Sequence, residues 1–410
     1  MDAGGEDRFS VHPREVRTAL RRSPLVEPFL CGRYSFSPYM ACGHGCAYCD
    51  GRAEKYWVEG VFERDIVVRR NVPALLRREL PRLRETAPIV IRSGITDAYQ
   101  PLERIEGLTR ECAAILADHA MPVSVLTKSS LVLRDIETWD AVSRGPGFIL
   151  NLSIATLDES VRRRFEPGAS PIAERLETLR AFRARGMPVG VMAMPLLPFI
   201  SDGEDQVRAL VAALKEAGAA FVMPGGLTLR PGRQKNFYLE RVGEAYPDLL
   251  PRYRSIYAED RASGAATRSY SAALEKRTAS IAIDSGIPFL LPHVCYREWL
   301  PLYDEIHLLL QHMAELYKAR RVPTEALGSA TRWYADWLLQ KKRAFNRRRS
   351  LTQGELEEET RALFGGTGGL DLLRNEKLAV FLRRVVIDRK VFEYTTLSLS
   401  TAEPHHPGDS

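Results

Sequence analysis

Residues 34–50 read Tyr34-Ser-Phe-Ser-Pro-Tyr-Met-Ala-Cys42-Gly-His-Gly-Cys46-Ala-Tyr-Cys49-Asp50. A strand-like segment is followed by three cysteines spaced C-x3-C-x2-C, with glycines between the first two. Glycine allows the backbone to turn tightly, so this loop can wrap around a compact inorganic core. Three thiolates on one short loop predict a metal site.

The spacing favours an iron–sulfur cluster over zinc. A structural zinc site usually closes a tetrahedron with four Cys or His ligands, often from paired C-x2-C units, and the sequence has no second such pair. Three cysteines on a [4Fe–4S] cluster leave one iron open to a substrate or cofactor, whereas four saturate the cluster. His44 inside the loop could complete a zinc set, and Cys31 could be a fourth ligand or a structural thiol. Both alternatives stay open at this point.

The motif, with the aromatic Tyr48 directly before its last cysteine, resembles the signature of the radical S-adenosylmethionine (SAM) superfamily. The resemblance implies that Cys42, Cys46 and Cys49 ligate a [4Fe–4S] cluster, whose open iron is chelated by the amino and carboxylate groups of SAM. One-electron cleavage of the sulfonium would then leave a 5′-deoxyadenosyl radical that abstracts a hydrogen atom. An electron donor such as flavodoxin or ferredoxin is implied as a partner.

Length and composition set further bounds. With 410 residues the chain can bury one large core, or one core with an appended domain. No apolar run reaches the roughly 20 residues of a membrane helix, and the first residues do not have the pattern of a signal peptide, so we expect a cytoplasmic protein with no membrane partner. Six cysteines, three of them assigned to a cluster, suit a reducing compartment. The formal charge of +6 permits an anionic partner without requiring one.

Short apolar runs alternate with helical periods from the cysteine strand to about residue 235. The runs after the cysteine strand are residues 88–93, 122–127, 147–153, 187–194 and 219–224. Continuous apolar strands that alternate with amphipathic helices are typical of a covered parallel sheet. The pattern predicts an α/β fold, a partial (β/α)6 TIM-like barrel, which is also the fold that the resemblance implies.

Beyond residue 235 the alternation stops. We expect an N-terminal extension at 1–30, with residues 11–33 packed outside the main core, the barrel at 31–235, a mainly helical C-terminal region at 236–400 and a disordered tail at 401–410. One dense basic run could bind nucleic acid or form a solvated helix end. Its residues are Lys341, Lys342, Arg343, Arg347, Arg348 and Arg349. Thr352-x-x-Glu355 then resembles a capping box at the start of a helix.

Polar residues follow several strands at their carboxyl ends, where barrels of this kind gather their functional side chains. SAM carries a carboxylate, an amine, ribose hydroxyls and a purine, so its site needs a cation, acceptors and an apolar wall. The predicted SAM contacts are Tyr48, Thr96, Asp97, Lys128, Ser153, Glu166 and Met194. The predicted substrate contacts are Tyr99, Gln100, Arg230 and Tyr270.

Four short motifs narrow the resemblance to the spore photoproduct lyase family, over roughly residues 30–235. They are Thr96-Asp97, Thr127-Lys128-Ser129, Ser153-Ile-Ala-Thr156-Leu-Asp158 and Glu166-Pro167. In that family the lysine and serine that match Lys128 and Ser153 contact SAM, and the pair that matches Thr96-Asp97 lies at the SAM pocket. Photoproduct lyases also use a cysteine just before that pair to return a hydrogen atom to thymine, but the matching residue here is Gly94. We therefore expect a relative with another substrate. Cys295 could be the hydrogen donor or an auxiliary ligand there, or it could be a buried structural thiol.

Three hypotheses follow for the function. The first is a radical SAM enzyme, catalysing a lyase or transferase type of reaction on a substrate enclosed between the barrel mouth and the C-terminal helices. Its alternative is nucleic-acid repair or modification of the photoproduct lyase type. The second is a nucleic-acid-binding protein whose cluster is structural. The third is a scaffold stabilised by zinc. The sequence does not identify the substrate.

Overall fold

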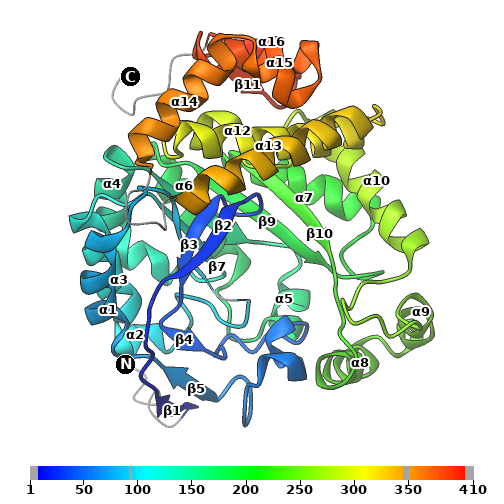
Figure 1. The fold of residues 1–410 in the computed structure, drawn as a ribbon. Helices are drawn as coiled ribbons and strands as arrows, with labels where there is room; N and C mark the ends of the chain where they lie inside the picture. The colour runs from blue at the N-terminus through cyan, green and yellow to red at the C-terminus, as the bar shows by residue number, and fades with distance from the viewer. Residues whose placement is uncertain (1–7, 93, 345–350, 402–410) are drawn as a thin grey trace.

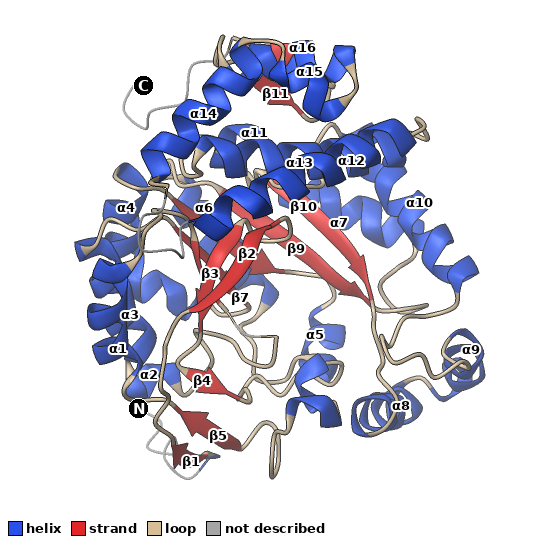
Figure 2. Ribbon diagram, in the orientation of Figure 1, coloured by secondary structure: helices blue, strands red, loops and turns tan. Residues whose placement is uncertain are grey.

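The structure is a computed structural model that describes residues 8–92, 94–344 and 351–401. At its centre is a seven-stranded sheet with the strand order β10-β9-β8-β7-β6-β3-β2 (Figures 1 and 2). Six of its strands are parallel: Gly32–Phe36 (β3), Ile89–Ile91 (β6), Val123–Thr127 (β7), Phe148–Ser153 (β8), Val189–Leu196 (β9) and Phe221–Gly226 (β10). Because β10 and β2 form the two edges of the sheet, the barrel is partial. The predicted α/β fold is confirmed.

Helices make up most of the remaining chain. In the barrel region they are Val72–Glu79 (α1), Glu103–Glu106 (α2), Leu108–Asp118 (α3), Ile136–Arg144 (α4), Glu159–Phe165 (α5), Ile172–Arg183 (α6) and Glu204–Glu216 (α7). The later helices are Arg233–Ala245 (α8), Leu250–Ile256 (α9), Arg268–Ser285 (α10), His293–Tyr296 (α11), Leu302–Ala319 (α12), Glu325–Ala344 (α13), Gln353–Gly365 (α14), Gly368–Leu373 (α15) and Glu376–Val386 (α16). The region beyond residue 235 is therefore mainly helical, as the sequence predicts.

Helices α1, α3, α4, α6 and α7 cover the outer face of the sheet, because alternate residues of each strand point outward and are apolar. Val125 of β7 and Leu150 of β8 are fully buried in one cluster with Leu116 of α3 and Phe182 of α6. The opposite faces of the same strands are buried too. A parallel strand buried on both sides gives the continuous apolar runs that the sequence shows.

The inner face packs against the C-terminal helices. Val90 of β6 and Ile149 of β8 belong to the same buried cluster as Leu309 of α12, and Figure 1 shows α12 and α13 lying across one end of the sheet. A Cβ on Gly147, which directly precedes β8, would lie 2.2 Å from Trp299. Trp299 lies between α11 and α12, so the C-terminal helices cover the amino ends of the strands. The expectation that they close over the opposite, carboxyl end is wrong for α12 and α13.

Some strands do not appear in the sequence pattern. Arg21–Glu27 (β2) pairs antiparallel with β3, so residues 11–33 do not pack wholly outside the core as expected. A small sheet joins Ser10–Pro13 (β1), Asp65–Val68 (β5) and Tyr39–Met40 (β4), and Val391–Glu393 (β11) pairs with Ser398–Ser400 (β12). β4 and β5 flank the cysteine loop, so this small sheet sits beside the region where the predicted site lies.

The basic run has a different environment from the one expected of a nucleic-acid contact. Lys342 is buried, and its Nζ lies 2.9 Å from Glu85 and 2.8 Å from Asp304. Lys341 pairs with Glu359. Arg343 is exposed, and Arg347, Arg348 and Arg349 lie outside the described residues, as does the tail from residue 402. The prediction that Lys342 contacts nucleic acid is therefore wrong, since a buried and doubly paired ammonium cannot reach a phosphate.

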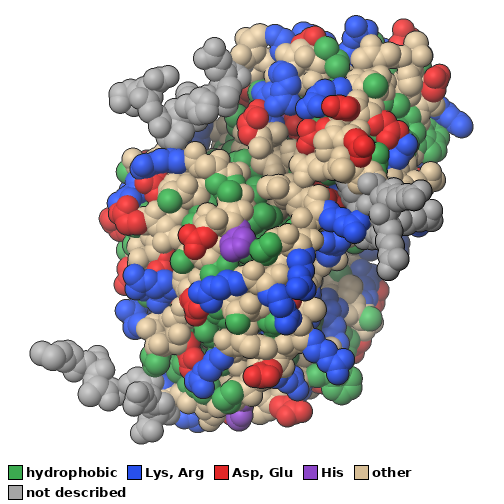
Figure 3. Space-filling view, turned by 60° about the vertical axis from the view of Figure 1, so that its left-hand side comes forward, with side chains coloured by type: hydrophobic (Ala, Val, Ile, Leu, Met, Phe, Trp, Pro, Cys, Tyr) green, Lys and Arg blue, Asp and Glu red, His purple; other side chains and the backbone are tan. Residues whose placement is uncertain are grey.

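Acidic and basic side chains are interspersed over the face of the molecule in Figure 3. The predicted capping box is confirmed: Thr352 is the N-cap of α14, and its hydroxyl and the Glu355 carboxylate each accept a hydrogen bond from the other residue's backbone N–H. Within the part of the chain that the structure describes, no helix is both long and apolar enough to cross a membrane.

Candidate active site

The cysteine loop follows β4 and is held in place by backbone and side-chain hydrogen bonds from distant parts of the chain. Gln100 accepts a hydrogen bond from the N–H of Gly43 at 2.8 Å, and the N–H of Gly168 donates to the carbonyl oxygen of His44 at 2.8 Å. The loop and residue 168 approach so closely that a Cβ on Gly168 would lie 2.4 Å from the carbonyl oxygen of Gly43. The local fold therefore requires glycine at residue 168.

Arg52 ties the loop together through its backbone carbonyl groups. Its Nε donates to the carbonyl oxygen of Cys46 at 2.9 Å, and its Nη2 donates to that of Gly45 at 3.0 Å. Glu63 lies 3.0 Å from the same guanidinium. Gly45 has a φ of 64°, a left-handed conformation that glycine adopts without strain. The loop is thus shaped by contacts to its backbone, which leaves its thiols available for ligands.

The three thiols of the motif line one cavity of about 400 Å³ at the carboxyl ends of the strands. All three cysteines are free, and Cys42 and Cys46 are buried. Burial raises the pKa of each thiol, and with the nearby charge of Glu166 it raises that of Cys46 to about 12. Thiols in such surroundings become thiolates when a metal centre binds them. The donor set therefore fits an iron–sulfur cluster.

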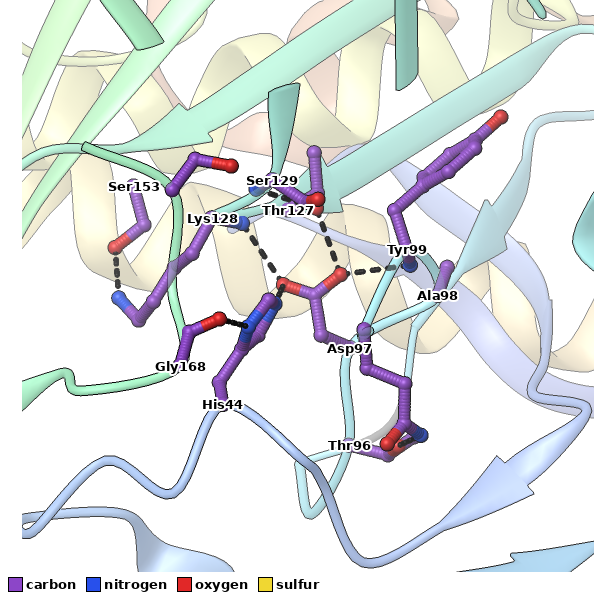
Figure 4. A network of polar contacts seen from close by, with 12 residues as sticks. His44, Thr96, Asp97, Ala98, Tyr99, Thr127, Lys128, Ser129, Ser153 and Gly168 are labelled. Atoms are coloured by element: carbon purple, nitrogen blue, oxygen red, sulfur yellow. Dashed lines mark hydrogen bonds and ion pairs between the residues drawn. The ribbon is translucent and has the colours of Figure 1, made fainter. Parts of the chain in front are cut away.

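The two residues that could have supplied a fourth ligand are engaged elsewhere. The Nδ1 of His44 lies at hydrogen-bonding distance, 2.9 Å, from the carbonyl oxygen of Gly168, and its Nε2 lies 3.3 Å from Asp97 (Figure 4). Cys31 is fully buried in the cluster around α12, beyond the amino ends of the strands. Among the described residues, no three or more His, Cys, Asp or Glu side chains are grouped so that together they could hold a single metal ion.

Asp97 organises the polar wall of the cavity. Its carboxylate accepts hydrogen bonds from the Thr127 hydroxyl at 2.7 Å and from the backbone N–H groups of Lys128 and Tyr99, both at 2.8 Å (Figure 4). Burial alone would raise the pKa of this carboxyl, but the nearby His44 and the hydrogen bonds lower it. Asp97 therefore joins the ends of β6 and β7 as a carboxylate.

A second group of charges lies beneath the end of β8. Glu166 is buried and pairs with Arg175 at 2.6 Å and with Lys128 at 3.5 Å, and it accepts a hydrogen bond from the Tyr48 hydroxyl. Burial opposes ionisation of Glu166, but Arg175 and Lys128 outweigh it and lower its pKa to about 2. Two cations thus share one carboxylate, which leaves net positive charge where Lys128 meets the cavity and donates to the Ser153 hydroxyl.

Most of the predicted SAM contacts line the cavity together with the thiols. They are Tyr48, Thr96, Asp97, Lys128, Ser153 and Met194. Glu166 is not among the lining residues and acts from beneath, through Lys128 and Tyr48. The cavity also has apolar lining residues, among them Leu126, Met192 and Pro195. The arrangement can bind a ligand that has an anionic end and a flat apolar part.

The predicted substrate contacts do not meet at this cavity. Tyr99 is fully buried in the core, and its hydroxyl accepts a hydrogen bond from Trp139 at 2.9 Å. Gln100 is also fully buried and holds the cysteine loop. Both predictions are wrong, because neither side chain is exposed to a substrate. Arg230 contacts Asp50, a lining residue of the cavity, at 3.2 Å. Tyr270 donates to Asp202 at 2.7 Å and lines a neighbouring cavity of about 270 Å³, which shares Gly226, Leu227 and Thr228 with the first.

Cys295 lies at the other end of the barrel. Cys295 and His293 both lie in α11, and the N–H of Phe392 in β11 donates to His293 at 3.0 Å. Arg183, whose charge acts on Cys295, donates to the carbonyl oxygen of Met187 just before β9. The carboxyl ends of the strands, where the thiols of the motif lie, are on the opposite side. The prediction that Cys295 donates hydrogen to the product is therefore wrong.

The sequence reasoning missed several residues that position the site, chiefly Arg52, Arg175 and Gln234. Gln234 is fully buried, and its Nε2 donates to the carbonyl oxygen of Tyr48 at 2.9 Å and to Asp50 at 3.2 Å. Arg52 stands three residues after the motif, so its closeness to the cysteines is visible in the sequence. No local pattern marks Gln234, because its contact spans 186 residues of sequence.

Comparison with known proteins adds the following similarities. Residues 36–218 match the family model of the radical SAM superfamily. An uncharacterized protein of Mycobacterium tuberculosis (strain H37Rv) is 31% identical over 257 residues, which cover 61% of this chain and 74% of that protein. A radical SAM Nalpha-GlyT isomerase of Pseudomonas phage M6 is 22% identical over 259 residues, 62% of this chain and 49% of that protein. A mutant spore photoproduct lyase with bound AdoMet and dinucleoside spore photoproduct gives a TM-score of 0.47 at 17% identity, over 67% of this chain and 79% of that one.

Proposed function

We propose that this chain, which belongs to the radical SAM superfamily, is an enzyme that cleaves SAM reductively at a [4Fe–4S] cluster and takes a hydrogen atom from a substrate. One observation carries the proposal. Three thiols of one loop line the same cavity as Lys128, Ser153 and Thr96, at the carboxyl ends of parallel strands. Functional side chains gather at that end in (β/α) barrels.

Cys42, Cys46 and Cys49 would hold the cluster. When bound, such a cluster would supply the one electron that breaks the S–C5′ bond of SAM into methionine and a 5′-deoxyadenosyl radical. Arg52 and Gln234 fix the loop by bonding its carbonyl oxygens. The thiols are thereby held in one arrangement before the cluster binds, which reduces the ordering cost of binding.

The cation and hydroxyls of the cavity suit the polar parts of SAM. Lys128 keeps net positive charge, because Glu166 is shared between it and Arg175; the ammonium can therefore attract the carboxylate of the methionine end. The Ser153 hydroxyl, which donates to the carbonyl oxygen of Met194 at 3.3 Å, has lone pairs for an amine or a ribose hydroxyl. Asp97 holds the backbone of residue 128 and so sets the direction in which Lys128 leaves β7.

The apolar lining of the cavity, the electron donor and the cellular compartment complete the proposal. Leu126, Met194 and Pro195 line the cavity, and they can exclude water from around a purine and from a reactive carbon radical. The electron would come from a donor such as flavodoxin or ferredoxin. A cluster held by three thiolates suits a reducing compartment, so we place the enzyme in the cytoplasm.

The test is the conversion of SAM to 5′-deoxyadenosine. Anaerobically reconstituted protein with dithionite should form 5′-deoxyadenosine, and Cys46→Ala should abolish its formation. Cys112→Ala is the matched control, because Cys112 is a buried free thiol of α3 in the core and lies outside the cavity. If the wild type binds iron and SAM but yields no 5′-deoxyadenosine, the proposal is wrong.

Metal analysis of the same samples separates the other hypotheses. A scaffold stabilised by zinc predicts one zinc and little iron in protein purified without oxygen. A structural cluster predicts iron and sulfide that Cys46→Ala removes, with no SAM cleavage in the wild type. The proposed enzyme predicts iron, sulfide and cleavage together, and their joint loss in the Cys46→Ala protein.

A further inference from the structure

A second cavity, of about 620 Å³, lies beside the candidate active site. Its described lining residues come from the segment before and into β2, the carboxyl end of β3, β4, the segments after the cysteine loop and after β5, and Arg92, Gly94 and Ile95 after β6. Five of its lining residues are basic: Arg17, Arg21, Lys55, Arg69 and Arg92. We call this cavity the basic cleft. Among the lining residues that the structure describes there is no Asp or Glu.

The charge of the basic cleft is compensated in part, because the Glu79 carboxylate accepts a hydrogen bond at 3.1 Å from the backbone N–H of Ala19, a lining residue. Arg92 pairs with Glu27, the one carboxylate that forms an ion pair with a lining residue in the described parts of the chain. Arg69 is half-buried, and although its Nη1 donates to the carbonyl oxygen of Ser37 at 3.1 Å, its buried Nε finds no acceptor among the described residues. Burial, with Arg21 and Arg14 nearby, lowers the pKa of Arg69. Uncompensated cations around a cavity favour an anionic ligand.

The basic cleft and the active-site cavity share a boundary. Arg92 and Gly94 line both of them. A Cβ on Gly94 would lie 3.8 Å from the hydroxyl of Tyr56, which also lines the basic cleft. Tyr56 lines the basic cleft, and its hydroxyl donates to Asp50 of the active-site cavity at 3.4 Å. The two cavities therefore adjoin at Arg92 and Gly94, so a ligand in the basic cleft lies next to the cavity that holds the thiols.

We propose that the basic cleft binds the phosphate part of the substrate, while the part that reacts reaches past Gly94 into the active-site cavity. The inference rests on the proposed function and names its substrate class, a phosphate ester. Arginine and lysine are the usual partners of phosphate oxygens, and the planar guanidinium can form two parallel hydrogen bonds with them. The phosphate can be a monoester on a small molecule or a diester in a nucleic-acid strand.

Binding of defined probes to the reconstituted protein tests the proposal without requiring turnover. The probes are glycerol 3-phosphate for a monoester and a short single-stranded oligonucleotide for a diester. The Arg21→Ala/Lys55→Ala protein should bind the preferred probe at least about tenfold more weakly at low salt, and the slope of log K against log salt should become shallower for an oligonucleotide. Both side chains are exposed, so the variant should fold.

The matched control is Arg180→Ala/Arg208→Ala, which removes two exposed charges from α6 and α7 on the outer face of the barrel. It should bind the probe as the wild type does. An equal loss of affinity in both variants, or no binding of either probe by the wild type, would overturn the inference. Cleavage of SAM in the absence of substrate should be the same in all three proteins, so its failure would count against the proposed function and not against the basic cleft.

Discussion

The guanidinium of Arg52 is a charged group that contacts the backbone of the cysteine loop. It donates to two carbonyl oxygens of the loop and lies 3.9 Å from the centre of the Phe237 ring in α8. Charged donors bonded to buried carbonyls contribute about 1.5–3 kcal/mol each, and the loop has left-handed backbone at Gly45. Arg52 is therefore one of the side chains, with Gln100 and Gln234, that hold the loop on which the three thiols lie.

We expect Arg52→Gln to lower the free energy of unfolding by about 2 kcal/mol and to reduce the iron bound after reconstitution. The shorter neutral side chain cannot reach both carbonyl oxygens. The checks are chemical denaturation together with iron and sulfide analysis. Arg241→Gln is the control, because Arg241 stacks on the same Phe237 ring at 5.1 Å but is exposed and pairs with Glu244. Unchanged stability and iron content in Arg52→Gln would contradict this assignment.

At the scale of elements, the strands of the barrel could be predicted because each is buried on both faces and therefore continuously apolar. The edge strand β2 could not, since its sequence Arg21-Arg-Ser-Pro-Leu-Val-Glu27 is polar where it faces solvent. The very short strands β4, β11 and β12 have too few residues to show a period. Edge strands and short hairpins take their structure from partners far away in the sequence.

The residues of the candidate site also divide into those that the sequence predicts and those that it does not. Lys128 and Ser153 could be predicted because they lie at the carboxyl ends of β7 and β8, and strand ends meet at one edge of the barrel. Thr96 lies in the loop after β6 and still lines the cavity. Tyr99 and Gln100 come after Asp97, where the chain turns into α2 and the direction of a side chain no longer follows the strand. Cys295 was misplaced because α11 packs at the amino ends of the strands. That placement depends on contacts with β11 and α12, which no local pattern reveals.

Helix α12 predicts a dependence of stability on pH. Burial lowers the pKa of His307 and of His312 from 6.5 to about 4, with the charge of Lys342 contributing at His307. His312 also accepts from or donates to Tyr394 at 2.8 Å. Between pH 6.5 and 4 the unfolded chain binds protons that the folded chain refuses, so stability is highest above pH 6.5 and falls as the pH drops toward 4.

Each histidine should cost up to about 3 kcal/mol over that range. The measurement is the urea midpoint at a series of pH values. His307→Gln should lose less stability on acidification than the wild type. Parallel pH profiles for wild type and His307→Gln would show that this buried imidazole does not drive the acid sensitivity.

At the scale of the whole molecule, the C-terminal helices are joined to the barrel by a buried ionic cluster. Lys342 of α13 contacts Glu85 before β6 and Asp304 of α12, and Arg33 at the start of β3 lies 3.1 Å from Glu85. All four side chains are buried. The C-terminal region therefore braces the amino ends of the strands, and the carboxyl ends remain free for the thiol cavity and the basic cleft.

We expect Lys342→Met to destabilise the protein by about 3–5 kcal/mol, because it leaves two buried carboxylates with one arginine between them. Lys341→Met, one residue away, removes a partly exposed pair with Glu359 and should cost no more than about 1 kcal/mol. Denaturation curves of the two variants give the comparison. Equal effects would mean that the buried cluster does not join the two parts of the molecule.

The central claim is that the cluster on Cys42, Cys46 and Cys49 keeps one iron for SAM. The most direct measurement is electron–nuclear double resonance of the reduced, reconstituted protein with SAM labelled by ¹⁵N at its amino group and ¹⁷O at its carboxylate. An iron that binds SAM should show hyperfine coupling to both labels and none to a protein imidazole. Coupling to the ring nitrogen of His44, with no coupling to bound SAM, would contradict it.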